Sequence, residues 1–97
     1  MTNILLVEDE KNVREPLAEY LEKEGFGILT AATLAEANLK VSDKVDLVIL
    51  DWMLPDGQGI EFLKNPEIQK KQTPTILLTA RTELIDKVLG LELGASD

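Results

Sequence analysis

Short continuous apolar runs alternate along the chain with longer stretches of helical spacing. The clearest runs are Ile4–Val7, Leu47–Leu50 and Ile76–Leu78, and each is followed directly by a polar residue. Runs of this length are typical of strands that are buried on both faces of a sheet. We therefore predict a strand at each run, and a weaker strand over Phe26–Ala31, which is the second of the four in chain order.

The first helical stretch lies between the first two strands. Val13, Leu17 and Leu21 recur at every fourth position, which predicts an amphipathic helix with these side chains on its buried face. Gly25 is a suitable residue for the helix end. Pro16 fits best near the first turn, where its missing N–H costs least, and farther inside it would kink the helix.

Three further helices are expected along the chain. They are a helix over Leu34–Val41 with Thr33 as its N-cap, a helix from about Ile60 that Asn65-Pro66 ends or breaks, and a helix over Thr82–Leu93. In the middle one, Ile60 and Leu63 are the expected buried residues, and Lys70, Lys71 and Gln72 are expected in a solvated loop. Alternating strands and helices predict one α/β domain over residues 1–97, an open doubly wound parallel sheet with helices on both faces.

Composition narrows the chemistry that is possible. The 97 residues include no Cys and no His, which excludes disulfides, thiolate or imidazole catalysis and metal sites built on these ligands. With 18 acidic and 10 basic side chains the net charge is -8, which argues against direct nucleic-acid binding. The start of the chain does not resemble a signal peptide and the apolar runs are too short to span a bilayer, so we expect a cytoplasmic protein without membrane contact.

Polar residues follow three of the four predicted strands. They are Glu8 and Asp9 after the first, Asp51 after the third and Thr79 after the fourth. Ligands of open parallel sheets bind at the carboxyl ends of the strands, so these residues are expected to converge. Clustered carboxylates suit Mg²⁺, and together with a hydroxyl they suggest phosphoryl transfer, with Asp51 as nucleophile and Thr79 as hydrogen-bond donor.

Four segments of the chain, in order, resemble the receiver domain of two-component response regulators, a CheY-like, flavodoxin-like fold. The segments are Ile4–Glu10, Val48–Gly57, Pro74–Arg81 and Gly90–Ala95. The resemblance implies the strand order 2-1-3-4-5. It also implies that Asp51 is the phosphoacceptor and that Asp51, Asp9, Glu8 and the Met53 carbonyl are the Mg²⁺ ligands. Thr79 would be the switch hydroxyl, with Ala80 as the small residue beside it, and Pro55 and Gly57 would shape the loop after Asp51.

The chain departs from the family pattern at its C-terminal end. Receivers continue with a fifth strand and a fifth helix, and the Lys at the end of that strand is absent from these residues. Either the 97 residues are a truncated receiver from a longer chain, which we favour, or a partner supplies the missing pieces. In the second case the edge of the fourth strand would be free to pair, so a homodimer is possible.

The resemblance implies a phosphorylation-controlled switch rather than a turnover enzyme. A sensor histidine kinase would transfer a phosphoryl group to Asp51, and the altered surface would act on an output domain, such as a transcription factor, or on a second receiver. One alternative is an aspartyl-nucleophile phosphatase or phosphotransferase, although Met53 stands where such enzymes place a second Asp. The other alternative is a receiver-like interaction module that is never phosphorylated. Taken singly, Thr79 could be an ordinary strand residue and Asp56-Gly57 an ordinary turn.

Overall fold

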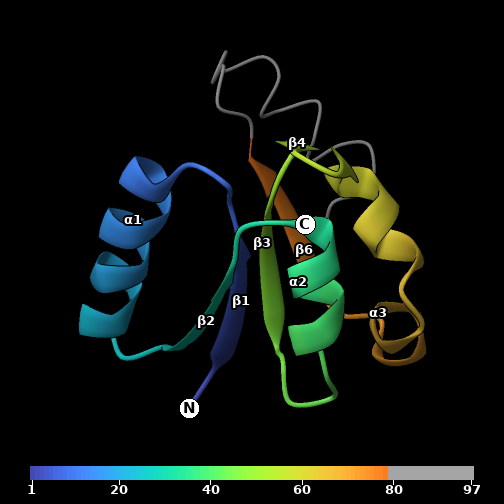
Figure 1. Cartoon of the computed structure of the whole chain (residues 1–97). Coiled ribbons are helices and arrows are strands. Elements are labelled where there is room, and N and C mark those ends of the chain that lie inside the picture. Colours follow the sequence, from blue (N-terminus) through green and yellow to red (C-terminus); the bar gives the residue numbers. More distant parts are fainter. Residues whose placement is uncertain (79–97) are drawn as a thin grey trace.

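The computed structural model describes residues 1–78 of the chain, which form a central sheet with helices on both sides (Figure 1). The strands are β1 (Asn3–Val7), β2 (Gly27–Ala31), β3 (Leu47–Asp51), β4 (Met53–Leu54), β5 (Gly57–Gln58) and β6 (Thr75–Leu78). The helices are α1 (Lys11–Lys23), α2 (Leu34–Lys40) and α3 (Pro66–Lys71), and Gly59–Lys64 forms a 3₁₀ helix, η1. The predicted helix over Thr82–Leu93, and the site candidates Thr79 and Ala80, lie outside the described residues.

The main sheet has the strand order β2-β1-β3-β6, and every neighbouring pair is parallel. All four predicted strands are confirmed, each to within one residue at its ends. In the register, Val7 pairs with Ala31 and Leu50, and Asp51 pairs with Leu78. The carboxyl ends of the strands therefore meet at one edge of the sheet. α1 lies on one side of the sheet, and α2 lies on the other (Figure 1), which confirms the doubly wound arrangement.

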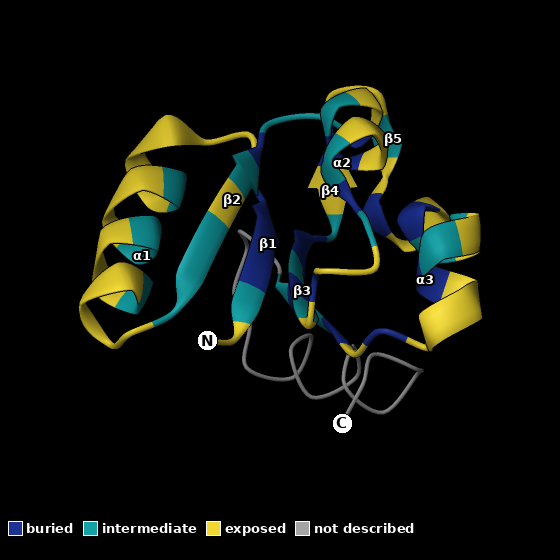
Figure 2. Ribbon diagram, turned by 90° about the horizontal axis from the view of Figure 1, so that it is seen from below, coloured by how far each residue is buried: buried dark blue, intermediate teal, exposed yellow. Residues whose placement is uncertain are grey.

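The main core lies between the sheet and the helices α2, η1 and α3 (Figure 2). Alternate strand residues point into it, so Leu5, Val7, Val48 and Leu50 are all fully buried there. Phe62 of η1 packs against them with only 1% of its surface exposed. The run Ile4–Val7 is buried throughout, so both faces of β1 are covered, whereas the faces of β3 and β6 that point away from this core carry half-buried apolar residues.

The buried face of α1 differs from the one that was predicted. Val13 is 44% exposed, so its place in the buried stripe was wrong, and no residue of α1 is fully buried. The half-buried residues of the helix are Arg14, Leu17, Ala18 and Leu21, which share one face by their spacing. The helix begins at Lys11, so Pro16 lies in the second turn and not in the first. Leu17 and Leu21 were placed correctly on the packed face of α1. One turn before Leu17, this face carries Arg14 rather than Val13.

The segment after β5 also differs from the prediction. Ile60 is 42% exposed and Phe62 is the buried residue, while Leu63 packs only partly against the core. Lys70 and Lys71 lie in the last turn of α3 rather than in a solvated loop. The break at Asn65-Pro66 was predicted correctly, but it also starts a new helix, because the Asn65 side chain accepts the Glu67 N–H and proline is well suited to a first turn.

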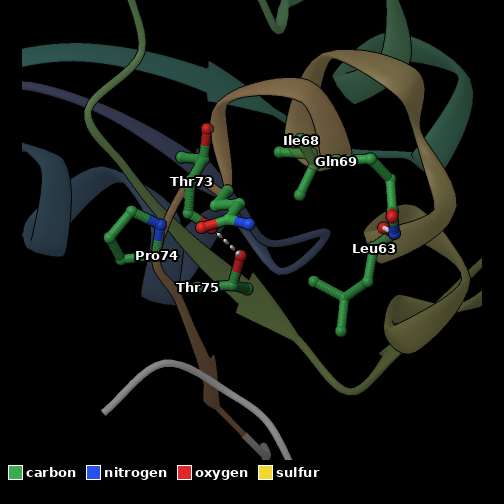
Figure 3. A pocket seen from close by; sticks show the side chains of 7 residues that line it. Leu63, Ile68, Gln69, Thr73, Pro74 and Thr75 are labelled. Carbon is green, nitrogen blue, oxygen red and sulfur yellow. Dashed lines mark hydrogen bonds between the residues drawn. The ribbon is translucent and has the colours of Figure 1, made fainter.

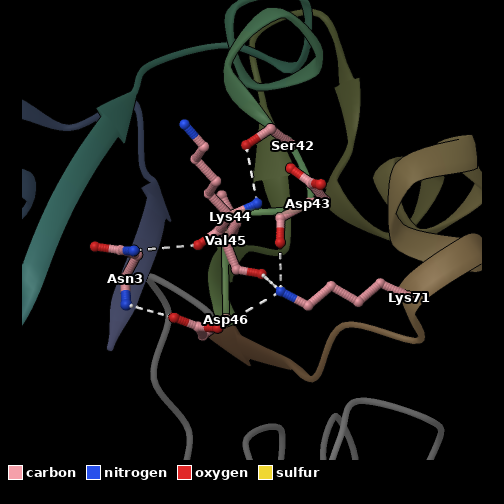
Figure 4. Close-up of polar contacts among 7 residues, drawn as sticks. All are labelled: Asn3, Ser42, Asp43, Lys44, Val45, Asp46 and Lys71. Carbon is pink, nitrogen blue, oxygen red and sulfur yellow. Dashed lines mark hydrogen bonds and ion pairs between the residues drawn. The ribbon is translucent and has the colours of Figure 1, made fainter. Parts of the chain in front are cut away.

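The edge of the sheet at the amino ends of the strands is held by a polar network (Figure 4). The Lys71 Nζ donates to the carbonyl oxygens of Asp43 and Val45 at 2.6 and 2.9 Å. It also lies 3.5 Å from an oxygen of Asp46, whose other oxygen accepts the Asn3 N–H. Within residues 1–78, this lysine joins the end of α3 to the loop before β3 and, through Asp46, to β1.

A cavity of about 480 Å³ lies near this edge, between α3 and the start of β6 (Figure 3). Thr73 lines it, and its hydroxyl is buried without a hydrogen-bond partner among the described residues. The cavity is at the opposite end of β6 from the acidic residues. No helix within residues 1–78 is long and apolar enough to cross a membrane.

Candidate acidic site

Three carboxylates converge at the carboxyl edge of the sheet. Glu8 and Asp9 follow β1, and Asp51 is the last residue of the neighbouring strand β3. One oxygen from each side chain lies within 4.8 Å of the other two. Glu8 and Asp51 are 2% and 3% exposed, whereas Asp9 is open to solvent. The expected convergence of these residues is therefore present, with two buried acids beneath one exposed acid.

Glu8 is held in place by its own backbone and side chain. Its N–H continues the sheet ladder by donating to the Ala31 carbonyl at 2.9 Å. Its carboxylate turns back and accepts the Glu10 N–H, also at 2.9 Å. The start of α1 is thereby tied to the buried acid, because Glu10 is the N-terminal flanking residue of that helix.

The cluster disfavours full ionisation in the absence of a cation. Burial raises the pKa of Glu8 to about 7, and the negative charge of Asp51 adds to the shift, whereas the Glu10 N–H opposes it. Burial also raises the pKa of Asp51, with hydrogen bonds from Glu8 and the Met53 N–H opposing the rise and Asp9 adding to it. A proton shared between the two buried acids relieves their repulsion.

The chain after Asp51 wraps closely around it. β4 and β5 form a small antiparallel hairpin, in which Met53 pairs with Gln58. The Gly59 N–H then donates to the Trp52 carbonyl at 2.7 Å. A Cβ atom on Gly59 would collide with the Asp51 carbonyl. Gly59 was not among the predicted site residues, because a glycine at this position is the only sign of the close approach in the sequence.

The loop residues named from the sequence have separate places around the site. Asp56 does not join the acidic cluster, because its two oxygens accept the N–H groups of Leu34 and Ala35 at 2.8 and 3.0 Å. Gly57 has φ +152°, and a Cβ there would approach a Leu34 methyl group to 2.7 Å. Pro55 is exposed in the hairpin turn. The loop shape attributed to Pro55 and Gly57 thus includes a direct contact with α2.

Two expected parts of the site are not described. Thr79 follows Leu78, which pairs with Asp51 and accepts the Trp52 N–H at 2.7 Å. The roles of Thr79 and Ala80 remain predictions. Within residues 1–78 no ion pair involves Glu8, Asp9 or Asp51, so the lysines described here do not neutralise the cluster.

The donor set fits a hard divalent cation. Three carboxylates supply oxygen ligands on one side, and the exposure of Asp9 leaves the other side open to water. Mg²⁺ prefers this combination of a few carboxylates with retained waters or phosphate oxygens. The pKa values of the two buried acids are raised because their ionised forms are unfavourable here, and a bound cation would stabilise those ionised forms.

Comparison with known proteins identifies the family. The response regulator receiver domain matches residues 4–97. The transcriptional regulatory protein CpxR of Klebsiella pneumoniae is 47% identical over 97 residues, and the CpxR homolog of Haemophilus influenzae is 49% identical over 98. Both alignments cover 100% of this chain, which spans only 41% and 42% of the length of those relatives.

Solved structures agree with this result. The non-phosphorylated HemR receiver domain of Leptospira biflexa is 38% identical with a TM-score of 0.76, covering 98% of this chain and 77% of its own. The BeF₃-activated N-terminal receiver domain of Klebsiella pneumoniae RstA is 33% identical with a TM-score of 0.79, covering 99% and 82%. The chain, with its parallel sheet and its acids at the carboxyl edge, belongs to the response regulator receiver family.

Proposed function

We propose that the domain accepts a phosphoryl group on Asp51 from the phosphohistidine of a sensor kinase. The observation that carries the proposal is the convergence of Asp51 with Glu8 and Asp9 at the carboxyl edge of the sheet. A carboxylate oxygen of Asp51 attacks phosphorus while the P–N bond of the donor breaks, and the histidine nitrogen leaves. The product is an acyl phosphate on Asp51, a form of nucleophilic catalysis in which the protein itself is the acceptor.

Glu8, Asp9, Asp51 and the Met53 carbonyl are the residues that would hold Mg²⁺. When bound, the cation neutralises the charge that gathers on the transferring group. The protein positions the acceptor through β3 and through the close approach of Gly59 to the Asp51 carbonyl. Because Asp51 is only 3% exposed, its carboxylate has little freedom to turn away.

The modification is proposed to act as a switch. Thr79 would contact the new phosphoryl group, and Ala80 would leave room for that movement, which biases a surface between two states. The relatives that match this chain are transcriptional regulators of more than twice its length. We propose that the partner reading this surface is an output domain of that kind or a second receiver, and that the switch operates in the cytoplasm, without turnover.

Intact mass measurement tests the assignment of Asp51. The chain is incubated with Mg²⁺ and acetyl phosphate, and the mass is expected to rise by one phosphoryl group. Asp51→Asn should abolish the gain and Asp9→Asn should reduce it strongly. Asp43→Asn is the matched control, because Asp43 is an exposed aspartate in the loop before β3, at the other edge of the sheet. It should be modified like the wild type.

The alternatives predict different outcomes. A folded chain that gains no mass under these conditions would contradict the proposal and favour a receiver-like interaction module. Modification that survives in Asp51→Asn would show that another residue is the acceptor. Rapid release of phosphate from many equivalents of acetyl phosphate, with no lasting gain in mass, would indicate an aspartyl phosphatase, because the acyl phosphate of a switch has to persist.

A further inference from the structure

Arg14 reaches out of α1 to the loop that carries the two N-terminal acids. Its Nη1 atom donates to the Glu8 carbonyl at 2.9 Å and lies 3.3 Å from the Asp9 carbonyl, to which it also donates. Arg14 is half-buried, on the same face of the helix as Leu17 and Leu21. The side chain therefore occupies a place in the packed stripe of α1 and ends on the backbone of the acidic site.

The loop is held from two directions. From the sheet side, the Glu8 carboxylate accepts the Glu10 N–H. From the helix side, the Arg14 side chain donates to the carbonyls of Glu8 and Asp9. The backbone N–H of Arg14 donates to the Glu10 carbonyl at 2.8 Å. The carbonyls of Glu8, Asp9 and Glu10 and the Glu10 N–H are therefore all hydrogen-bonded in the conformation that directs Asp9 toward Glu8 and Asp51.

We propose that Arg14 is a positioning residue for the cation site, and this rests on the proposed function. Within residues 1–78 its side chain hydrogen-bonds to backbone carbonyls and not to the carboxylates of Glu8, Asp9 or Asp51. It acts by fixing the backbone between Glu8 and Asp9, which brings the exposed carboxylate of Asp9 to the buried pair. Partners that orient metal ligands in this way commonly contribute 10- to 100-fold to metal affinity.

Geometry rather than net charge carries this role. Arg14 lies near enough to Glu36 to help lower the pKa of that carboxyl, after the larger effects of the Ala32 N–H and Lys40. Its charge is not among the main influences on Glu8 or Asp51. Removing another positive charge from the same helix should therefore leave the site unchanged.

The test is Mg²⁺ titration followed by the fluorescence of Trp52, the single tryptophan, which directly follows Asp51. Arg14→Met keeps an unbranched stem in the stripe and removes the donors, and it should raise the Mg²⁺ Kd about tenfold. Arg14→Lys retains a donor and should recover part of the affinity. Lys11→Met removes a charge from the first turn of α1, where Lys11 is exposed and forms no ion pair within residues 1–78, and should bind like the wild type.

Amide hydrogen exchange gives a second readout that needs no cation. The Glu10 N–H should lose protection in Arg14→Met, while amides of β1 keep theirs. Unchanged Glu10 protection or unchanged Mg²⁺ affinity in Arg14→Met would overturn the role of Arg14, as would an equal loss in Lys11→Met. A wild-type chain whose Mg²⁺ affinity depends on Arg14 but which never gains a phosphoryl group would contradict only the proposed function. A wild-type chain that binds no Mg²⁺ would overturn both.

Discussion

Glu8 is the residue whose burial most affects the behaviour of the site. It is 2% exposed, it contacts a second buried acid, and its pKa is raised to about 7, first by burial and then by Asp51. A group whose pKa is raised in the folded state stabilises the fold when protonated. That contribution is complete below its ordinary pKa of about 4.5 and is lost as pH rises through about 7.

We therefore expect the chain without divalent cations to lose stability between about pH 4.5 and pH 7. Thermal unfolding across this range should show a falling Tm in the wild type and a much flatter profile in Glu8→Gln. Glu10→Gln is the control, because Glu10 is an exposed neighbour. A wild-type Tm that rises through the same interval, or a Glu8→Gln profile as steep as that of the wild type, would contradict the prediction.

Much of the site was predictable because strand ends are visible in the sequence. Apolar runs ending at Val7 and Leu50 place the following acids at one edge, provided that the strands are parallel. The parts that were missed depend on contacts between distant segments. The backbone of Gly59 closely approaches the Asp51 carbonyl. Arg14 reaches the Glu8 carbonyl because α1 begins at Lys11, only a few residues before it. Neither contact has a signature in local spacing.

At the scale of elements, the N-terminus of α2 shows how a local and a long-range cap combine. Thr33 was predicted as the N-cap, and its hydroxyl accepts the Glu36 N–H at 3.0 Å, which confirms that prediction. The two preceding donors, Leu34 and Ala35, are satisfied by Asp56, more than 20 residues away. The sequence indicated only a turn at Asp56, since its partners become neighbours only in the folded chain.

Asp56→Ala should destabilise the chain at neutral pH and remove part of its acid sensitivity. The N–H groups of Leu34 and Ala35 lower the pKa of Asp56, so its contribution is present above its ordinary pKa and is lost as pH falls through the lower folded-state value. Urea unfolding at pH 7 and at about pH 3 measures both effects. Thr33→Ala should cost about 1 kcal/mol at either pH, because a hydroxyl does not titrate. Equal losses at both pH values in Asp56→Ala would contradict this account.

α3 illustrates an element that sequence patterns describe poorly. Its six residues contain one buried apolar side chain, Ile68, so no amphipathic period could be recognised. The helix is instead fixed by the Asn65 cap at its start and by Lys71 at its end, which donates to two backbone carbonyls before β3. A pair of lysines before a turn ordinarily indicates solvent exposure, and both lysines are exposed, but the Lys71 ammonium group is also held by these backbone carbonyls.

The two lysines therefore form a matched pair for mutation. Lys71→Ala should destabilise the chain by about 1 kcal/mol, the typical net contribution of a hydrogen bond, whereas Lys70→Ala should change little because its contact with Glu67 is a long, exposed ion pair of 3.9 Å. Urea denaturation at neutral pH separates the two. If Lys70→Ala costs as much as Lys71→Ala, the network around Lys71 does not stabilise the fold.

At the scale of the whole molecule, the parallel sheet separates two kinds of polar residue. The amino edge carries the network of Asn3, Asp46 and Lys71, in which opposite charges meet. The carboxyl edge carries the three converging acids, which within residues 1–78 have no ion-pair partner. One edge therefore stabilises the fold, and the other holds like charges together at a cost, in a chain whose net charge is already -8.

This separation predicts that Mg²⁺ stabilises the entire fold through the carboxyl edge. A ligand that binds only the folded state, at 100 times its Kd, adds about 2.7 kcal/mol to the free energy of unfolding. For a domain of this size, such a gain raises the Tm by roughly 10 °C or more. NaCl at the same ionic strength is the control, since screening of the net charge alone would also give a small rise in Tm.

Asp51→Asn should start from a higher Tm without Mg²⁺, because one repelling charge is gone, and its Tm should rise much less when Mg²⁺ is added. Asp43→Asn should respond like the wild type. Equal gains with Mg²⁺ and NaCl, or an undiminished gain in Asp51→Asn, would show that the acids at the carboxyl edge are not where the cation acts.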